Sequence, residues 1–350
     1  MDQEELIQGI FNIIQDYHCD EPTSLTKGDI ENWINQFPLD DRYFFLSEFL
    51  HILQQGIYLS KAEAKEKLNE NLLLVFRKLG YTDVSRFIKQ TVFLNMQKEG
   101  KSQPELLKML TSIVKDKYGL TINTGLDKDA KNYVYIDDIV ATGKTVRTDL
   151  NKWLQEKDID GISFADKIKK GALQLVVSAF CSHTWAENNI HWIFKCSYEN
   201  DIFLKQPLFV SSYKIENHVH PSSRLNFAYP QYDATIAKSY FDTLSGNYED
   251  KAFRATNTPK KETFYSSPEN RIRFENIMLI KGIAILERVQ KKNPAHRPLG
   301  ATNPSYKTMG TGTLFFTWRN VSNTCPLIFW WDNASHGWKR LFPLKNRGSK

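Results

Sequence analysis

The stretch "YVYIDDIVATGKT" at residues 133–145 decides the fold class of this chain. An apolar run ends in two adjacent acids, and a short loop with a glycine leads into the start of a helix. The letters "GKT" suggest a nucleoside-triphosphate P-loop, but that motif needs a glycine five positions before Gly143, where the chain has Asp138. A carboxylate there would face the phosphates that such a loop wraps. Two interpretations remain: a different phosphate site, or an ordinary strand–turn–helix corner.

The flanking sequence alternates β-rich runs with helical patterns. Short apolar runs are expected to be strands at residues 91–96, 133–136 and 173–180, with a further candidate at 119–124. Helices are expected at 103–118, where Ser102 is the predicted N-cap and Pro104 lies in the first turn, and at 145–155. The run at 173–180 is almost continuously apolar, as in a parallel sheet that is buried on both faces. The pattern predicts an α/β fold with a parallel sheet flanked by helices.

Residues 1–80 read as a separate helical region, and residues 81–350 as the α/β domain. The front shows four helical patterns, near residues 3–18, 27–37, 40–55 and 59–79, with Thr26 and Ser60 as caps. In the second part, helices are expected at 231–245 and from Ser267 and Pro268 to about residue 290. A C-terminal extension from about 293 to 350 is rich in aromatic residues, and we expect strands at 313–320 and 326–331.

Charge is unevenly distributed along the chain. The 350 residues carry a net charge of +6, but residues 1–60 hold 11 acids and 2 bases, and residues 281–350 hold 12 bases and 2 acids. Such asymmetry suggests that the two ends meet each other, or that the C-terminal part meets an anionic partner. Two separately solvated surfaces explain the pattern equally well.

The composition indicates a protein of the reducing cytoplasm. The four cysteines include no C-x-x-C pair, so neither a zinc site nor a redox motif is indicated. The acidic N-terminus lacks the basic start and apolar core of a signal peptide. No apolar run approaches the roughly 18 residues that would span a bilayer, and we expect no membrane association.

The residues at 137–145 suit a sugar phosphate. Asp137 and Asp138 are expected at the carboxyl edge of the sheet, where α/β proteins bind ligands. The loop and the helix N-terminus offer backbone N–H groups to a phosphate, and Thr142, Lys144 and Thr145 add hydroxyl donors and a charge. Carboxylates accept hydrogen bonds from vicinal hydroxyls and ligate Mg²⁺. Together the two ends suit a ribose 5-phosphate, whereas an unliganded corner would hold two adjacent acids at a cost.

"VYIDDIVATGKT" resembles the phosphoribosyl pyrophosphate (PRPP) signature of type I phosphoribosyltransferases, in which an apolar strand, two acids and two apolar residues precede [AG]-T-G-x-T. The resemblance implies that Asp137 and Asp138 hold the ribose hydroxyls, as catalytic residues and with Mg²⁺ as the cofactor they would bind. It implies that the 5-phosphate is cradled by the residues of the following loop: Ala141, Thr142, Gly143, Lys144 and Thr145.

A second loop, in "TVFLNMQKEGKSQPELL" (residues 91–107), supplies the other half of such a site. It places Lys98, Gly100, Lys101 and Ser102 between a strand and a helix, where that family binds the pyrophosphate. The family's usual sequence for this loop is absent, so the correspondence holds for the loop and not for its individual residues. An ordinary surface loop with lysines is the competing interpretation.

Other stretches resemble a divergent bacterial branch: the phosphoribosyltransferase-like proteins of conflict and anti-phage systems, some of which accompany retrons. The stretches are "IENWINQF" (30–37), "GKSQPELLKML" (100–110) and "NVSNTCPLIFWW…WKRLFP" (320–343), the last of which departs from the branch's usual N-T-P-N-N-T-L-P. The resemblance implies a toxic effector that acts on PRPP or a related nucleotide. The alternatives are an inactive nucleotide-sensing or nucleic-acid-binding module that regulates a partner protein, and a structural subunit whose acidic front docks on a basic partner.

Two further groups of residues have competing interpretations. In the C-terminal block, Trp330, Trp331 and Trp338 are candidates to stack on a base, or else core residues of a closing hairpin. His218 and His220 share a strand face that a metal could use, although two such ligands alone are weak evidence.

Overall fold

The computed structural model describes residues 1–21, 24–127, 129–217 and 225–344. The chain forms two compact units. Unit 1 combines Met1–Lys61 with Ile215–Lys350, and unit 2 is the continuous segment Ala62–Lys214 between them. Both ends of the chain therefore build one unit, and the α/β segment is inserted between them. The predicted division between residues 80 and 81, with an extension from about 293, stays a prediction.

Unit 2 contains a four-stranded sheet in the order β2-β3-β4-β5. Its strands are β2 (Thr91–Leu94), β3 (Asn132–Val140), β4 (Gln174–His183) and β5 (Leu208–Ile215). β3 pairs in parallel with β2 and with β4, so its carboxyl end lies beside theirs. Every residue of β2, and all of β4 after its first residue, is buried. The parallel α/β sheet predicted from the apolar runs is confirmed.

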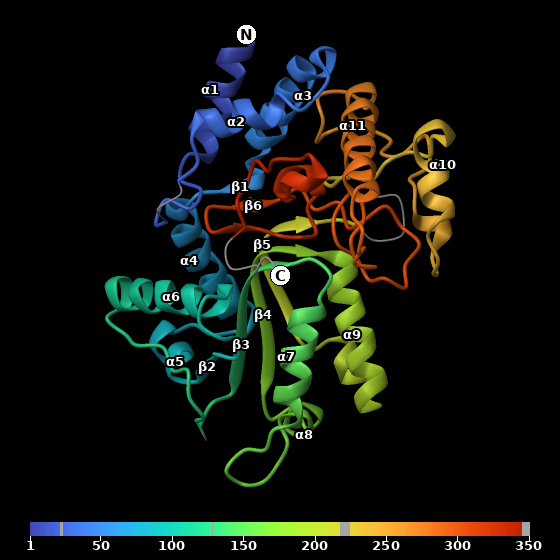
Figure 1. The fold of residues 1–350 in the computed structure, drawn as a ribbon. Coiled ribbons are helices and arrows are strands. Elements are labelled where there is room, and N and C mark those ends of the chain that lie inside the picture. The colour runs from blue at the N-terminus through green and yellow to red at the C-terminus, as the bar shows by residue number, and fades with distance from the viewer. Residues whose placement is uncertain (22–23, 128, 218–224, 345–350) are drawn as a thin grey trace. The chain divides into compact units, whose positions relative to one another are not determined.

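Helices cover both faces of this sheet, with α5 and α6 on one side and α7 and α9 on the other (Figure 1). The helical elements of unit 2 are α4 (Lys61–Lys78), α5 (Val84–Lys89), α6 (Ser102–Tyr118), α7 (Lys144–Gln155), α8 (Phe164–Lys169), α9 (Thr184–Tyr198) and the 3-10 turn η2 (Asp201–Leu204). On the α7 side, Tyr133 packs against Trp153 and Phe164, whose rings stack at 4.4 Å. The strand predicted at 119–124 is wrong, because only Asn123 bridges to Val92 there.

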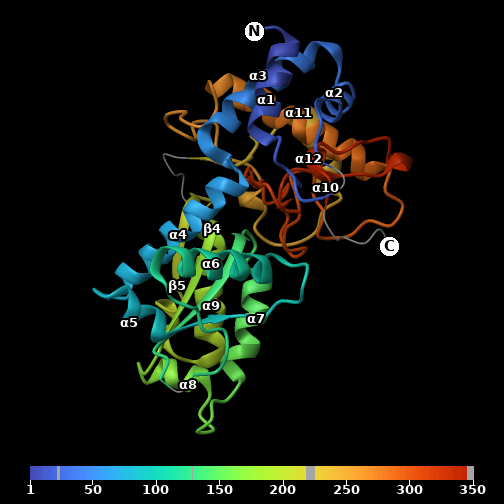
Figure 2. The ribbon, with the colours of Figure 1, turned by 90° about the vertical axis from the view of Figure 1, so that its left-hand side faces the viewer.

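Unit 1 holds the N-terminal helices and most of the irregular chain (Figure 2). Its elements are α1 (Gln3–Ile14), α2 (Lys27–Ile34), α3 (Leu39–Ile52), η1 (Leu53–Ile57), β1 (Tyr58–Leu59), α10 (Ala234–Asp242), η3 (Glu249–Lys251), α11 (Pro268–Glu287), β6 (Phe316–Thr317), β7 (Asn320–Val321), α12 (Leu327–Trp330) and η4 (Ala334–His336). The predicted caps are confirmed for two helices: Thr26 accepts from the Asp29 amide, and Ser267 accepts from the Asn270 amide.

The C-terminal aromatic block differs from the predicted pair of strands. β6 and β7 are two residues each, and residues 327–330 form the short helix α12. Pro326 contributes to the difference, because it has no N–H to donate to a strand ladder and it occupies the N-cap position of α12. Local aromatic content favours a strand, but the proline and the surrounding packing override that preference.

The acidic front and the basic C-terminal block meet inside unit 1. The Trp33 indole donates to the Ile328 carbonyl at 2.8 Å, and the Tyr17 hydroxyl donates to the Pro343 carbonyl at 2.6 Å. The Trp33 ring also packs 5.7 Å from Phe329. Aromatic packing and hydrogen bonds to the backbone therefore join the two ends of the chain.

Candidate functional site

The two adjacent acids lie at the carboxyl end of β3, as predicted, but in different environments. Asp137 is only 6% exposed, whereas Asp138 is partly open to solvent. Asp137 Oδ1 accepts hydrogen bonds from the Ser102 hydroxyl at 2.6 Å and from the Asp138 amide at 2.9 Å. Burial raises the pKa of the Asp137 carboxyl well above its usual range, and the charge of Asp138 adds to this effect, whereas the Ser102 hydrogen bond lowers the pKa. Asp138 is the more accessible of the two carboxylates.

The loop after β3 has the shape of an anion site. Gly143 adopts a left-handed conformation with φ 71°, and α7 begins at the next residue. Ala141 is buried under the loop, Thr142 is half-buried, and Lys144 and Thr145 are exposed. The first-turn N–H groups of a helix lack partners within the helix, so they are available to an anion. The five predicted loop residues therefore surround one helix N-terminus.

The second predicted loop connects β2 to α6 and ends at the same edge of the sheet. Lys98, Gly100 and Lys101 are exposed. The prediction that Ser102 caps α6 is wrong: Lys101 occupies the N-cap position without a side-chain bond, and Ser102 is the first helical residue. Its hydroxyl instead donates to Asp137, and hydrogen bonds to a carboxylate are among the stronger ones in proteins. Ser102 thus joins the two predicted loops.

Sequence reasoning missed four polar residues that hold these loops. The Gln103 side-chain oxygen accepts from the Met96 amide at 2.6 Å and from the Gln97 amide at 3.1 Å. The Gln97 side chain donates to the Tyr135 hydroxyl, which donates to Asp149 on α7. Gln103 has no exposed surface. A glutamine in the first turn of an amphipathic helix was the available signal, but its burial depends on the tertiary fold.

Four cationic side chains lie in the loop before α6 and in the first turn of α7. Lys98, Lys101 and Lys144 are exposed and Arg147 is half-buried. Within the part of the chain that the structure describes, none of these four side chains forms an ion pair, so their charges are available to an anionic ligand. The edge of the sheet therefore combines carboxylates, which accept hydrogen bonds from sugar hydroxyls, with cations, which attract a phosphate.

The donor set fits Mg²⁺ only in company with a ligand. Across the described residues, no group of three or more His, Cys, Asp and Glu is arranged to hold a metal. Asp137 and Asp138 supply two carboxylates, and Mg²⁺ is commonly held by one or two carboxylates together with substrate phosphates and water. The residues present are compatible with that arrangement and not with a site made of protein ligands alone.

A family model described as PRTase-CE matches residues 30–344 of the chain. The chain belongs to the PRTase-CE family. It is therefore a phosphoribosyltransferase-like protein, as the strand–loop–helix at 133–145 predicted. No curated protein and no solved structure matches the chain. The PRTase-CE match extends over both units, from α2 to the residues after Trp338.

The C-terminal aromatic residues of this PRTase-CE protein belong mainly to its core. Trp330 and Trp338 are each 5% exposed, and their indole N–H groups donate to the Cys325 and Ile328 carbonyls. The interpretation that these two tryptophans stack on a base is therefore wrong. Trp331 is half-buried, and its indole donates to His336. His218 and His220, the candidate metal pair, lie outside the described residues.

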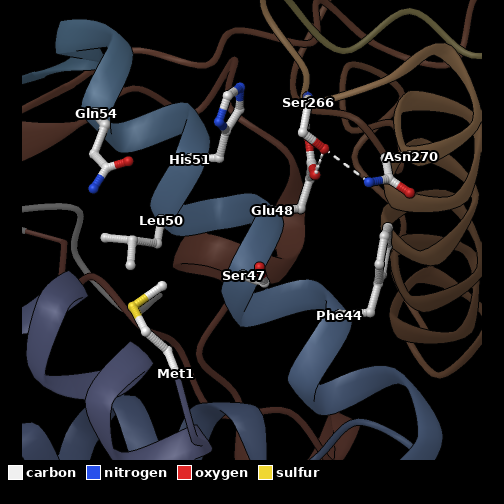
Figure 3. Close-up of a pocket in the computed structure, with 9 residues that line it drawn as sticks. All are labelled: Met1, Phe44, Ser47, Glu48, Leu50, His51, Gln54, Ser266 and Asn270. Carbon is white, nitrogen blue, oxygen red and sulfur yellow. Dashed lines mark hydrogen bonds between the residues drawn. The ribbon is translucent and has the colours of Figure 1, made fainter.

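Unit 1 also has a hollow between α3 and the start of α11, lined in part by Met1, His51 and Gln54 (Figure 3). At its wall, Glu48 accepts from both the amide and the hydroxyl of Ser266, which in turn accepts from Asn270. These bonds tie α3 to the cap region of α11. Hydrogen bonding within the protein already occupies the carboxylate, so we assign Glu48 a structural role.

Among the described residues, none of the helices combines the length and the apolar composition that a membrane-spanning helix needs.

Proposed function

We propose that the site in unit 2 binds PRPP, or a related ribose-phosphate nucleotide, together with Mg²⁺, and transfers or cleaves at the anomeric carbon. The observation that carries the proposal is the end of β3. Asp137 and Asp138 are followed, five residues after the second acid, by the left-handed Gly143, which is the N-cap of α7. The membership in a phosphoribosyltransferase-like family supports it.

Each part of the site has a role in this proposal. Asp138, with Asp137 behind it, accepts hydrogen bonds from the ribose hydroxyls as positive charge develops at the anomeric carbon. The N–H groups of residues 141–145 hold the 5-phosphate. Lys98 and Lys101 stabilise the pyrophosphate as its bond to the anomeric carbon breaks and it leaves with the electron pair. The acceptor, a base nitrogen or a water oxygen, supplies the new bond. Bound Mg²⁺ would add positive charge at the leaving phosphates.

We further propose that the activity serves a bacterial anti-phage system, of the retron-associated kind that the sequence resembles, as a toxic effector that modifies or depletes nucleotides. The resemblance of residues 30–37, 100–110 and 320–343 to proteins of such systems motivates this step. Expression of the wild-type protein and an Asp138→Asn variant in a bacterial host, with nucleotide pools measured, tests it. Equal pools and equal growth in the two cultures would contradict an effector role.

A second candidate is a nucleotide sensor that binds without turnover. The observation that favours it is that Asp137 is buried and that its Oδ1 already accepts hydrogen bonds from the Ser102 hydroxyl and from the Asp138 amide. A sensor keeps the ribose and phosphate contacts and signals to a partner protein. A nucleic-acid-binding role is less favoured, because Trp330 and Trp338 are buried.

Calorimetry with PRPP and Mg²⁺, together with an assay of pyrophosphate release, separates these candidates. Asp138→Asn should weaken PRPP binding about tenfold or more, which corresponds to about 1.4 kcal/mol. Asp160→Asn is a matched control, because Asp160 is an exposed acid of unit 2 outside the site. Binding with pyrophosphate release supports the enzyme, and binding without release for any acceptor supports the sensor. Absence of binding by the wild-type protein to PRPP and to nucleoside 5′-phosphates would refute both.

A further inference from the structure

Tyr135 lies on β3, two residues before Asp137, and its side chain is fully buried. Its hydroxyl accepts from the Gln97 side-chain amide at 2.7 Å and donates to Asp149 Oδ2 at 2.7 Å. The direction of both bonds follows from the partners, since an amide nitrogen only donates and a carboxylate only accepts. One phenol therefore joins two side chains that come from different elements.

The two partners belong to the two halves of the site. Gln97 lies in the loop between β2 and α6, next to Lys98. Asp149 lies in the second turn of α7, the helix that begins at the candidate phosphate loop. Burial raises the pKa of the Tyr135 phenol, so the group stays neutral and keeps its proton for Asp149. The connection therefore persists across the physiological pH range.

Several other bonds of the first loop end on β3 or within α6. Gln103 holds the Met96 and Gln97 amides and donates to the Ile136 carbonyl at 3.2 Å, and Ser102 donates to Asp137. These bonds hold the loop against the strand. The Tyr135 hydroxyl extends the same network to α7 through two partly buried hydrogen bonds, so movement of the first loop or of the start of α7 breaks a bond at the phenol.

We propose that the Tyr135 hydroxyl is a positioning group that couples the two halves of the site, so that a diphosphate at the loop of residues 97–101 and a sugar phosphate at residues 141–145 bind cooperatively. The inference rests on the proposed function, because it assigns those two ligand groups to the two loops. A ligand that orders one loop fixes Tyr135 through its hydrogen bond, and the other loop then needs less ordering to bind.

The test measures pyrophosphate affinity by calorimetry, with Mg²⁺, in the absence and presence of saturating ribose 5-phosphate. In the wild-type protein, ribose 5-phosphate should strengthen pyrophosphate binding about fivefold or more, the lower range of typical coupling. Tyr135→Phe removes only the hydroxyl and should bring this factor close to one. A merely structural loss would weaken pyrophosphate binding equally in both conditions and leave the factor unchanged.

Tyr133→Phe is the matched control. Tyr133 lies on the same strand two residues earlier, is 4% exposed, and packs through its ring against Trp153. No hydrogen bond of its hydroxyl is found among the described residues. Its variant should keep the wild-type factor. Gln97→Leu removes the donor from the loop without altering the strand, and should lower the factor as Tyr135→Phe does, even if Tyr135→Phe fails to fold.

Hydrogen exchange on the ligand-free protein separates this inference from the proposed function. Tyr135→Phe should accelerate exchange of the Met96 and Gln97 amides together with the first two turns of α7, and Tyr133→Phe should not. A wild-type protein that binds neither ligand refutes the proposed function, and with it the assignment of ligand groups. An unchanged coupling factor in Tyr135→Phe and Gln97→Leu, or unchanged exchange in either segment, overturns the coupling role of Tyr135.

Discussion

Replacement of Gly143 by alanine tests the loop geometry at the start of α7. The glycine has φ 71°, a left-handed conformation that costs an alanine about 1–2 kcal/mol. A Cβ at this position would also lie 3.0 Å from Ile190 Cδ1 and 3.4 Å from the Ala186 carbonyl oxygen, both on α9. The tip of the Ile190 side chain can yield by a few tenths of an ångström, so the strained backbone conformation accounts for most of the destabilisation.

Gly171→Ala is a control with the same backbone strain and no contact. Gly171 has φ 67°, and nothing lies within 4 Å of the position that its Cβ would take. It precedes β4, at the amino end of the strand and therefore at the opposite edge of the sheet. Both variants should lose up to about 1–2 kcal/mol of unfolding free energy in urea titrations, and local relaxation of the backbone reduces this loss.

The two variants should differ in ligand binding. In Gly143→Ala, relaxation of the strained residue turns the N–H groups of the loop away from the phosphate, and ribose 5-phosphate affinity measured by calorimetry should fall about tenfold. Gly171→Ala should stay within about twofold of the wild-type affinity. Equal affinities in the two variants would refute the assignment of this loop as the phosphate site, whatever their stabilities.

Two further predictions concern the stability of each unit. Burial lowers the pKa of His183 in unit 2 from 6.5 to about 3. Between these pH values the unfolded chain binds a proton at this histidine and the folded protein does not, so the free energy of unfolding falls as the pH falls from 6.5 toward 3. His183→Gln should flatten this decline by up to about 1.4 kcal/mol per pH unit, and an unchanged slope in urea titrations at pH 4, 5 and 6 would contradict the prediction. In unit 1, Trp33→Phe removes one of the two indole donors of the Ile328 carbonyl, the other being Trp338, and it opens a cavity. It should cost about 1–3 kcal/mol of unfolding free energy, and a loss below about 0.5 kcal/mol in denaturant titrations would contradict the role of the Trp33 indole in joining the two ends of the chain.

The sequence was sufficient to predict the parallel sheet and the position of the candidate site. Runs such as 173–180 are apolar without alternation, and the loop at 141–145 combines a glycine with a helix start, so both signals are local. The structure places Asp137 and Asp138 where those signals predicted. That these two acids bind a ribose stays a prediction.

The errors arise where tertiary contacts decide. Ser102 has the sequence position of a cap, yet its hydroxyl donates to Asp137, which lies on a strand 35 residues later. The aromatic run at 326–331 has strand propensity, yet Pro326 and the packing of Phe329 on Trp33 favour a helical turn. Tyr135 looked like any apolar strand residue, because the partners of its hydroxyl lie 38 residues before it and 14 after it.

The division into units changes how a role for the acidic front should be tested. The hypothesis that this front docks on a basic partner suggests deleting residues 1–80, but that deletion would remove Trp33 from the core of unit 1 and α4 from unit 2. Loss of function would then report unfolding. Glu4, Glu31 and Asp40 are exposed acids of the front, so their amide variants change charge without removing core residues.

The PRTase-CE match includes unit 1 as well as the segment that holds the candidate site. The match begins at residue 30, in α2, and ends at residue 344, so both of its limits fall inside unit 1, whereas the candidate site lies wholly in unit 2. A ribose-phosphate site alone would require only the inserted segment. The part of this chain that the family model matches therefore includes the inserted segment and portions of unit 1 on both sides of it. Point substitutions on the surface of unit 1, compared with substitutions at the candidate site in unit 2, should therefore test whether unit 1 contributes to function.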